Sequence, residues 1–333
     1  MVIVFTLLIL SVILVNGCTD APNAISSCVS TRSLSPSASI ALAAFCNFLG
    51  STLTALVNTK VASTVYSTVR LPQDAKTSLA ALIAGMGAVV IWAVAAWFFG
   101  IPTSESHALL SGLSGAVFAA SLSPNSIVFS DWLLVFAGLI LSTLPSLIAA
   151  RLIYSVILKL CAKHDRRRTI RYFMRTQRLS AAWSAFSHGA QDSQKFMGVF
   201  MLGMSINLGE FTKESFDIPW YVVICCSAVM TLGTLIGGRR IIKKVGMDMV
   251  DIDAVGGTAA DMASSAVLFL CTLFGIPVST THSKTSAMIG VGTKSGKGAD
   301  KRIVAQMLFA WILTFPICAL IGFLLSFLIL QLI

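Results

Sequence analysis

The sequence predicts an all-α membrane protein made of duplicated membrane repeats, with two re-entrant or broken helical hairpins. The first observation is composition, since 56% of the 333 residues are hydrophobic and only 11% are charged. Soluble domains average about 25% charged residues. The second observation is a set of long apolar runs, and the third is an internal repeat. The composition excludes a disordered chain, a collagen, a disulfide-stapled miniprotein and an ordinary soluble enzyme.

The apolar runs give eight candidate membrane-spanning segments. A bilayer-spanning helix needs about 20 predominantly apolar residues. The eight candidates begin near residues 1, 38, 77, 132, 179, 218, 258 and 303. Two further runs, 101–120 and 276–293, each open with Ile-Pro and are rich in Ser, Thr and Gly. We expect these two runs to be re-entrant or broken, and therefore surrounded by protein or by a water-filled cavity.

The distribution of basic residues predicts the orientation of the chain. Twenty-four Lys and Arg residues against fourteen Asp and Glu give a net charge of +10. Because the basic residues lie mostly between apolar runs, the excess fits a multi-pass cell-membrane protein, and we expect no nucleic-acid partner. The segment 159–178 holds eight basic residues and one acid, so we place it in the cytoplasm. The predicted organisation is a first membrane repeat at 1–158, a basic cytoplasmic linker at 159–180 and a second membrane repeat at 181–333.

The internal repeat is carried by two pairs of motifs. The segments FGIPTSESH at 99–107 and FGIPVSTTH at 274–282 share six of nine residues. A weaker pair, NGCTDAPN at 16–23 and HGAQDSQK at 188–195, shares its Gly and its Asp. The offsets between partners are 175 and 172 residues, in the same chain order. Duplicated halves, each with an interrupted hydrophobic segment, are typical of secondary transporters and mark the binding site.

Asp20 and Asp192 are the first candidate site residues. Each lies in an apolar element beside a Gly that we expect to break the helix. Because an Asp at mid-membrane costs about 2.5–3.5 kcal/mol, it needs a cavity, a cation or a partner. We predict a coupling-ion site in which Asn23 and Gln191 add side-chain amides. The alternative is a helix-end Asp at the lipid headgroups.

The two hairpin motifs predict an anion site. We expect each Pro to occupy the first turn of a short helix, because its missing N–H would be unpaired there. Ser and Thr hydroxyls then crowd the helix N-terminus, where free N–H groups and the helix dipole favour an anion. Two facing copies could surround a tetrahedral oxyanion, and ordinary Ser/Thr capping is the alternative. The predicted anion-binding residues are Ser104, Ser106, Ser279, Thr280 and Thr281.

Four further polar residues lie in or beside these motifs. Lys195 takes the place that Asn23 has in the first half, so its ammonium needs Asp192 or an anion as a partner, unless it snorkels to the interface. Glu105 stands where the second half has Thr280, and it is turned away, paired with a cation or protonated. The histidines, His107 and His282, are candidate ligands, bases or packing residues.

At these residues the chain resembles the inorganic phosphate transporter family. That family carries one Gly-Ala-Asn-Asp-x-x-Asn-Ala motif in each half, and its bacterial members often have variants similar to NGCTDAPNA at 16–24 and HGAQDSQK at 188–195. Its Pro-x-Ser-Thr-Thr-His element is similar to 277–282 and, more loosely, to 102–107. The resemblance spans residues 16 to about 293. Thr19, Gln191 and Lys195 depart from the family pattern.

The resemblance implies a cation-coupled symporter that imports inorganic phosphate, with Asp and Asn residues binding the cation and the Ser/Thr hairpins binding phosphate. It also implies inverted repeats and a homodimer. Four spans in each half would give parallel repeats instead, so the resemblance requires one segment fewer or more in each half. The same fold carrying sulfate is the first alternative, and an ion channel or a membrane enzyme is a more distant one. A carboxylate acceptor near the hairpins would favour phosphate over sulfate, and Glu105 is a candidate for it.

The coupling cation remains open between H⁺ and Na⁺, and we expect no other cofactor and no catalytic residue. Asp20 and Asn23 offer oxygen ligands that suit Na⁺. An ammonium has three donors and no acceptor, so Lys195 cannot ligate a metal ion and instead neutralises Asp192. At most one metal site of this type then remains, at Asp20 and Asn23. We therefore expect proton-driven uptake.

Overall fold

The described part of the chain is helical. The computed structural model describes residues 1–99, 103–208, 216–237, 250–296 and 298–332. In these ranges the regular structure consists of helices, and the β pairing is limited to an isolated bridge between Val69 and Ile127. The predicted all-α class is confirmed. A few side chains in helices, among them those of Trp97 and Phe99, lie outside the description.

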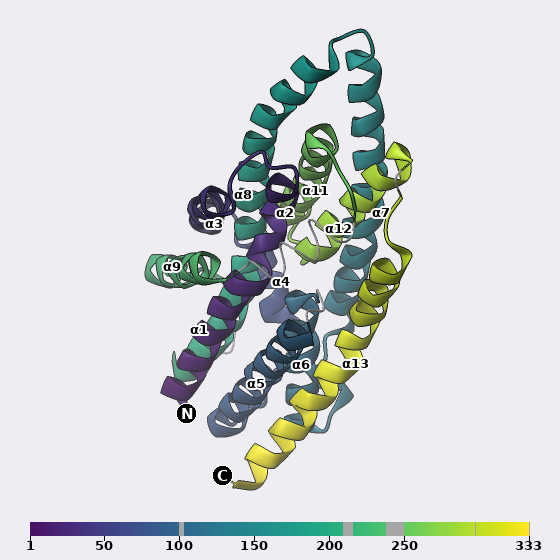
Figure 1. Ribbon diagram of the computed structural model, residues 1–333. Coiled ribbons are helices and arrows are strands. Elements are labelled where there is room, and N and C mark those ends of the chain that lie inside the picture. The colour runs from purple at the N-terminus through teal and green to yellow at the C-terminus, as the bar shows by residue number, and fades with distance from the viewer. Residues whose placement is uncertain (100–102, 209–215, 238–249, 297, 333) are drawn as a thin grey trace.

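Thirteen helical elements are described, and Figure 1 labels most of them. In chain order they are α1 (Val2–Thr19), α2 (Ala21–Ser30), α3 (Pro36–Val57), α4 (Lys60–Ser67), α5 (Ala75–Phe99), α6 (Glu105–Ser121), the 3₁₀ turn η1 (Pro124–Ser126), α7 (Phe129–Cys161), α8 (Arg166–Leu208), α9 (Trp220–Ile236), α11 (Ala254–Phe274), α12 (Thr280–Ser295) and α13 (Lys301–Leu332).

Six of the eight predicted spanning runs form helices that are long and apolar enough to cross a bilayer. They are Val2–Ser30, which combines α1 and α2, Pro36–Val57, Ala75–Ala96, Phe129–Cys161, Ala254–Phe274 and Lys301–Leu332. The other two runs are also helical. The run near 179 lies inside α8, whose first turns are strongly basic, and the run near 218 is α9, an apolar helix of 17 residues. The described helices therefore form a multi-pass membrane protein.

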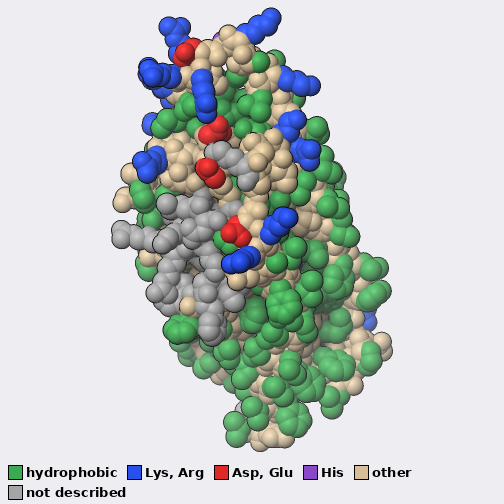
Figure 2. All heavy atoms as spheres, turned by 45° about the vertical axis from the view of Figure 1, so that its right-hand side comes forward, with side chains coloured by type: hydrophobic (Ala, Val, Ile, Leu, Met, Phe, Trp, Pro, Cys, Tyr) green, Lys and Arg blue, Asp and Glu red, His purple; other side chains and the backbone are tan. Residues whose placement is uncertain are grey.

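Exposed apolar side chains cover the two long helices α7 and α13. On α7 they include Leu133, Ile140, Leu144 and Leu152, and on α13 Phe309, Ile312, Leu320 and Phe327, each at least 48% exposed. Figure 2 shows hydrophobic side chains over the lower part of the molecule and Lys and Arg gathered at its upper end. An apolar surface of this extent suits lipid, because soluble monomers expose only small apolar patches.

The predicted basic linker is mostly helical. The last residues of α7 and the first fifteen of α8 carry its sequence, and only 162–165 lie outside a helix. Both helices project beyond the rest of the bundle and turn at the upper end of Figure 1, while both chain termini lie at the opposite end. Asp165 accepts the backbone N–H of Arg168 and so caps the start of α8. This cap allows the basic segment after the turn to form a helix.

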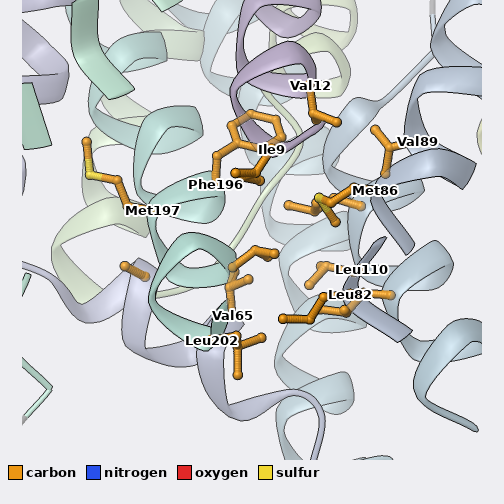
Figure 3. Close-up of a cluster of buried hydrophobic side chains, with 14 of the residues drawn as sticks. Ile9, Val12, Val65, Leu82, Met86, Val89, Leu110, Phe196, Met197 and Leu202 are labelled. Atoms are coloured by element: carbon orange, nitrogen blue, oxygen red, sulfur yellow. The ribbon is translucent and has the colours of Figure 1, made fainter. Parts of the chain in front are cut away.

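One hydrophobic core joins helices from both predicted repeats. Ile9 and Val12 of α1 and Met86 of α5 pack with Phe196 and Met197 of α8, as Figure 3 shows. Further pairings also cross the chain midpoint, because α6 packs along α13 and α12 packs along α7. The two short helices α6 and α12 are almost completely buried. Each short helix is thus held by a long helix from the other half of the sequence.

A buried ion pair that the motifs did not reveal connects four helices. Lys284 of α12 donates to Asp261 of α11, to the hydroxyl of Ser27 in α2 at 3.1 Å and to the carbonyl of Ala24 at 3.2 Å. Asp261 also accepts from Ser27 at 2.6 Å and from Ser180 of α8 at 3.2 Å. Every donor of the ammonium therefore has an acceptor, which is the condition for burying a charge.

The first half has apolar residues at the corresponding positions. The offset of 175 residues relates Asp261 to Met86 and Lys284 to Leu109, and both of these side chains are fully buried in the core. The same helix pairing can therefore be built with or without the ion pair. This difference gives a matched replacement for the pair.

We expect Lys284→Leu to be strongly destabilising, because it leaves the Asp261 carboxylate buried without its cation. Breaking a buried pair in this way costs about 3–5 kcal/mol, whereas replacing both members by apolar residues is often neutral. The double variant Asp261→Met/Lys284→Leu should therefore recover most of the lost stability. Thermal unfolding of the detergent-solubilised proteins measures this, and a double variant no more stable than Lys284→Leu would contradict it.

Candidate functional site

One motif Asp lies at a break between two helices, whereas the other lies inside a continuous helix. The helix is interrupted at Asp20, where α1 ends and α2 begins with Pro22 in its first turn. In contrast, α8 runs without interruption through Gly189 and Asp192. The expectation that both motif glycines break their helices is therefore wrong, since α1 also continues two residues beyond Gly17.

The motif glycines instead permit close approach of backbones. A Cβ atom on Gly17 would lie 2.3 Å from the carbonyl oxygen of Met230 in α9. A Cβ atom on Gly189 would lie 2.3 Å from the carbonyl oxygen of Asn47 in α3. Small residues let membrane helices pack this closely. These contacts bring the Asp-bearing segment of each half against a helix of the other half.

The N-termini of α6 and α12 meet inside the protein. Their first helical residues follow the N-caps Ser104 and Ser279, whose hydroxyl oxygens accept the backbone N–H of His107 and His282 at 3.3 Å. The rings of these two histidines are 4.6 Å apart. Two positive helix ends therefore converge at one buried place. The expectation that Pro277 occupies the first helical turn is wrong, since it lies two residues before the cap, and Pro102 lies outside the described residues.

Asp20 is bonded across the two halves to the start of α12. The hydroxyl of Thr281 donates to Asp20 Oδ1. Asn23 Nδ2 donates both to Asp20 Oδ1 and to Thr281 Oγ1, each at 2.9 Å. Asn23 Oδ1 is buried without a hydrogen-bond partner. This cluster therefore keeps one free amide oxygen next to a carboxylate.

Asp192 is bonded in a related way to Lys195 and to both short helices. Lys195 Nζ donates to Asp192 Oδ1, to the carbonyl of Val278 and to the hydroxyl of Ser106 at 2.6 Å. Thr280 donates to Asp192 Oδ2 at 3.1 Å. Lys195 is fully buried, so it does not snorkel to the membrane interface. Its ammonium sits among a carboxylate, a hydroxyl and a backbone carbonyl, which are the oxygen types that bind hard cations.

The two clusters are counterparts under the repeat. In each, a donor nitrogen three residues after the Asp binds that Asp and a hydroxyl of the opposite short helix. The matched pairs are Asp20 with Asp192, Asn23 with Lys195, and Thr281 with Ser106. A neutral amide in one half thus takes the place of an ammonium in the other.

Glu105 and Gln191 lie at the edges of these clusters. The buried Glu105 accepts a hydrogen bond from Thr19, and its Oε2 atom has no partner. Gln191 donates to the carbonyl of Ile276 at 2.9 Å and accepts from Thr272 at 2.5 Å. Gln191 therefore supports the backbone before α12, and its hydrogen bonds in the described part of the chain do not join it to Asp20 or Asn23. Its role as an ion ligand stays a prediction.

The hairpin histidines pack against aromatic rings. The ring centroid of His107 lies 4.4 Å from that of Phe315, and the ring centroid of His282 lies 3.7 Å from that of Trp311. Phe315 and Trp311 both belong to α13. Neither nitrogen of His282 has a hydrogen-bond partner. Of the three predicted roles, the described contacts show packing. They include no Ser hydroxyl bonded to either imidazole, as a nucleophile and its base would require.

Two site residues were missed by the sequence motifs. His188 places Nε2 3.2 Å from Asp192 Oδ2 and Nδ1 3.1 Å from Asn47 Oδ1. Oxygen and nitrogen atoms of Asp20, His188 and Asp192 lie within 4.8 Å of one another, so these residues form a candidate cation cluster. His188 belongs to a quoted motif and its repeat position is Asn16, but nothing in the sequence singled out Asn47.

A separate cavity of about 600 Å³ lies between α7, α12 and α13. Its lining is almost entirely apolar and includes Phe136, Leu144 and Ile312. Such a lining suits hydrocarbon rather than a polyvalent anion. The polar clusters around Asp20 and Asp192 are therefore the candidate functional site.

Comparison with known proteins identifies the family of this chain. The model of the phosphate transporter family matches residues 16–322. The chain is 34% identical over 309 residues to the probable low-affinity inorganic phosphate transporter of Bacillus subtilis (strain 168), covering 92% of this chain and 91% of that protein. It is 35% identical over 308 residues to the probable low-affinity inorganic phosphate transporter of Rhizobium meliloti (strain 1021), with 92% and 90% covered.

One more distant relative by sequence and one solved structure are also similar to the chain. The chain is 22% identical to the low-affinity inorganic phosphate transporter PitB of Escherichia coli (strain K12), with 91% of each chain covered. A solved structure described as the sodium-dependent phosphate transporter superposes with a TM-score of 0.88, at 18% identity, over 100% of this chain and 99% of that one. At this identity the superposition supports the fold alone. From the family match and the first two relatives, the chain belongs to the phosphate transporter family, and it is a membrane transporter rather than an enzyme.

Proposed function

We propose that this protein imports inorganic phosphate across the cell membrane by symport with protons. The observation that carries the proposal is the convergence of two helix N-termini, rich in Ser and Thr, on two buried carboxylates and an ammonium. Helix N-termini favour anions through their free N–H groups and dipole. A carboxylate pair at the same place favours the simultaneous uptake of positive charge.

The predicted phosphate-binding hydroxyls are available to an anion in two ways. Ser104 and Ser279 act as N-caps through their oxygen atoms, and their hydroxyl protons remain free to donate. Thr280 and Thr281 donate to Asp192 and Asp20. Phosphate therefore competes with these carboxylates for the same donors. This competition links the uptake of a cation by Asp20 to the binding of phosphate by Thr281.

Neutralising Asp20 releases Thr281 to the anion. A hydroxyl has a single proton to donate, and an ionised carboxylate holds it more strongly than a neutral group does. When Asp20 takes up a proton, its demand for donors falls and Thr281 can turn its hydroxyl toward phosphate. Cation uptake and phosphate uptake are then linked through one shared hydrogen bond, and each promotes the other.

The balance of buried charge requires a cation. Among the described residues, four carboxyl groups are buried, and only two ammonium groups accompany them. The carboxyl groups belong to Asp20, Glu105, Asp192 and Asp261, and the ammonium groups to Lys195 and Lys284. Asp192 and Asp261 each have a lysine within bonding distance, whereas Asp20 has none. Adding phosphate to this core without a cation would increase the unpaired negative charge, which is costly away from water.

A proton fits this requirement better than Na⁺. Lys195 occupies the oxygen cage of the second half, so a metal ion cannot also bind there. In the first half, the free oxygen of Asn23 and the carboxylate of Asp20 are the predicted metal ligands, and His188 offers a nitrogen close by. Na⁺ prefers an all-oxygen shell, whereas a proton needs only the carboxylate.

The orientation follows from the charge distribution. We place the basic segment 159–178 and the turn between α7 and α8 in the cytoplasm. Both termini then lie outside, because they are at the other end of the bundle (Figure 1). The inverted arrangement of the two halves and the homodimer remain predictions of the family resemblance. Sulfate transport by the same fold is the principal alternative.

The anion site is tested by Thr280→Val, which keeps the shape of the side chain and removes its hydroxyl. Losing a hydrogen bond to a charged group costs about 1.5–3 kcal/mol, so the KM for phosphate uptake should rise by roughly 10- to 150-fold. Thr258→Val is the matched control, because Thr258 is buried in α11 and donates only within its own helix at 2.8 Å. Labelled phosphate uptake into proteoliposomes gives both KM values, and an unchanged KM in Thr280→Val would remove Thr280 from the site.

The coupling cation is tested with separate Na⁺ and pH gradients at clamped voltage. We expect concentrative phosphate uptake with an inward proton gradient in the absence of Na⁺. An inward Na⁺ gradient at equal pH on both sides should have little effect, since Lys195 fills the second cage. Strong stimulation by Na⁺ under these conditions would show that the role of Lys195 is different.

Lys195→Asn makes the second half match the first at this position, and its dependence on Na⁺ can be compared with that of the wild type. The variant exchanges an ammonium for an amide oxygen and leaves Asp192 without its lysine, so a second oxygen site becomes available to a metal ion. Uptake by this variant should gain dependence on Na⁺. A variant that folds, transports phosphate and remains indifferent to Na⁺ would contradict the cage interpretation.

A further inference from the structure

We propose that Glu105 is the residue that selects phosphate over sulfate, by sharing the proton of a P–OH group through its free oxygen Oε2. The inference rests on the proposed function, because it assigns one further partner to the anion in that same site. Phosphate carries at least one proton near neutral pH, whereas sulfate carries none. A site that distinguishes the two needs an acceptor for this proton among its donors.

Glu105 is placed at the anion site by its position in α6. It is the first residue of the helix, between the N-cap Ser104 and Ser106, which accepts from Lys195. The side chain is only 3% exposed. The hydroxyl of Thr19, the neighbour of Asp20, donates to Glu105 Oε1. This bond holds the carboxyl group between the helix break at Asp20 and the N-terminus of α6.

The other carboxyl oxygen is buried without a partner. Glu105 Oε2 accepts no hydrogen bond of normal geometry in the described structure, and the amide of Asn16, which lies beside the Glu105 carboxyl group, also makes none. Asn16 is fully buried. Buried polar atoms in native proteins are almost always hydrogen-bonded, so a group of unpaired ones indicates a place where a ligand supplies the bonds. The ligand that Oε2 can bind must offer a proton.

The repeat shows that this acceptor is specific to one half. The corresponding residue in the second half is Thr280, which donates its hydroxyl proton to Asp192. The two facing helix N-termini therefore present a donor on one side and an acceptor on the other. A hydrogen phosphate ion, with several acceptor oxygens and one donor hydroxyl, matches this mixed arrangement, and sulfate matches only the donors.

Sulfate is rejected by the same geometry. With sulfate bound, Oε2 would face an oxygen with no proton between them, and the buried carboxylate would remain unpaired next to an anion. Sites built to bond a substrate hydroxyl discriminate strongly against analogues that lack it, because their buried polar groups are left unsatisfied. The free acceptor Oε2 of Glu105 therefore weakens the binding of sulfate and also strengthens the binding of phosphate.

Glu105→Gln is the primary test, with three anions compared in proteoliposomes. The change keeps size and supplies an amide that can donate to either anion. We expect the KM for phosphate to rise and the inhibition constant of sulfate to fall, so that the preference for phosphate over sulfate decreases on the order of 10- to 100-fold. Arsenate, which is protonated like phosphate, should follow phosphate. Glu105→Asp, which keeps the acceptor, should retain most of the preference.

Thr280→Val is the control for a general loss of binding, because it removes a donor that both anions use. It should weaken phosphate and sulfate alike and leave their ratio near the wild-type value. If Glu105→Gln abolishes uptake, the thermal stabilisation of the purified variants by phosphate and by sulfate gives the same comparison. A Glu105→Gln protein with the wild-type preference would overturn the proposal. Wild-type protein that neither transports nor binds phosphate would instead overturn the proposed function itself.

Discussion

The structure depends on keeping negative charge in the interior of a protein that lies in lipid. Buried carboxyl groups outnumber buried ammonium groups in the described residues, and no water-facing surface relieves them. Asp192 and Asp261 are each satisfied by a lysine that also bonds a hydroxyl and a carbonyl. Asp20 is left with neutral donors, and Glu105 with a single one. Because unpaired buried charge is costly, binding of a cation near Asp20 and Glu105 is energetically favourable.

The helical frame determines where this charge is placed. The short helices α6 and α12 are each packed along a long helix from the other half, α13 and α7. Their N-termini therefore meet in the interior rather than at a membrane surface, and their hydroxyls reach carboxylates from the opposite half, as Thr281 reaches Asp20. Because each cluster spans both halves, a relative movement of the halves must change the bonds of Asp20 and Asp192 together. The hydrogen bonds of the polar site and the packing of the helices are therefore coupled.

Composition and motifs predicted much of this arrangement, for identifiable reasons. Apolar runs gave the long helices because a bilayer imposes length and hydropathy, and the repeated Pro-x-Ser-x-x-His segments located the buried helix ends because their residue types serve N-termini. The continuity of α8 through Gly189 was not predictable, since glycine serves close packing as readily as a helix break. Asp261, Lys284 and Asn47 were also missed. Their partners come from distant segments, so no local pattern marks them.

The differences between the halves carry more functional information than their similarity. The shared residues supply donors to one buried place from two directions, which any tetrahedral anion would accept. Four differences between the halves at the buried polar clusters alter charge: Asn23 against Lys195, Glu105 against Thr280, Met86 against Asp261, and Leu109 against Lys284. In the second half two ammonium groups are held permanently, one of them by the added acid Asp261, while the first half gains the acid Glu105. Under the proposed symport, exchangeable positive charge is therefore concentrated near Asp20 and Glu105, between the end of α1 and the N-terminus of α6. Identical halves would offer symmetrical cation sites, whereas the proposed mechanism confines the exchangeable cation to a single side of the anion.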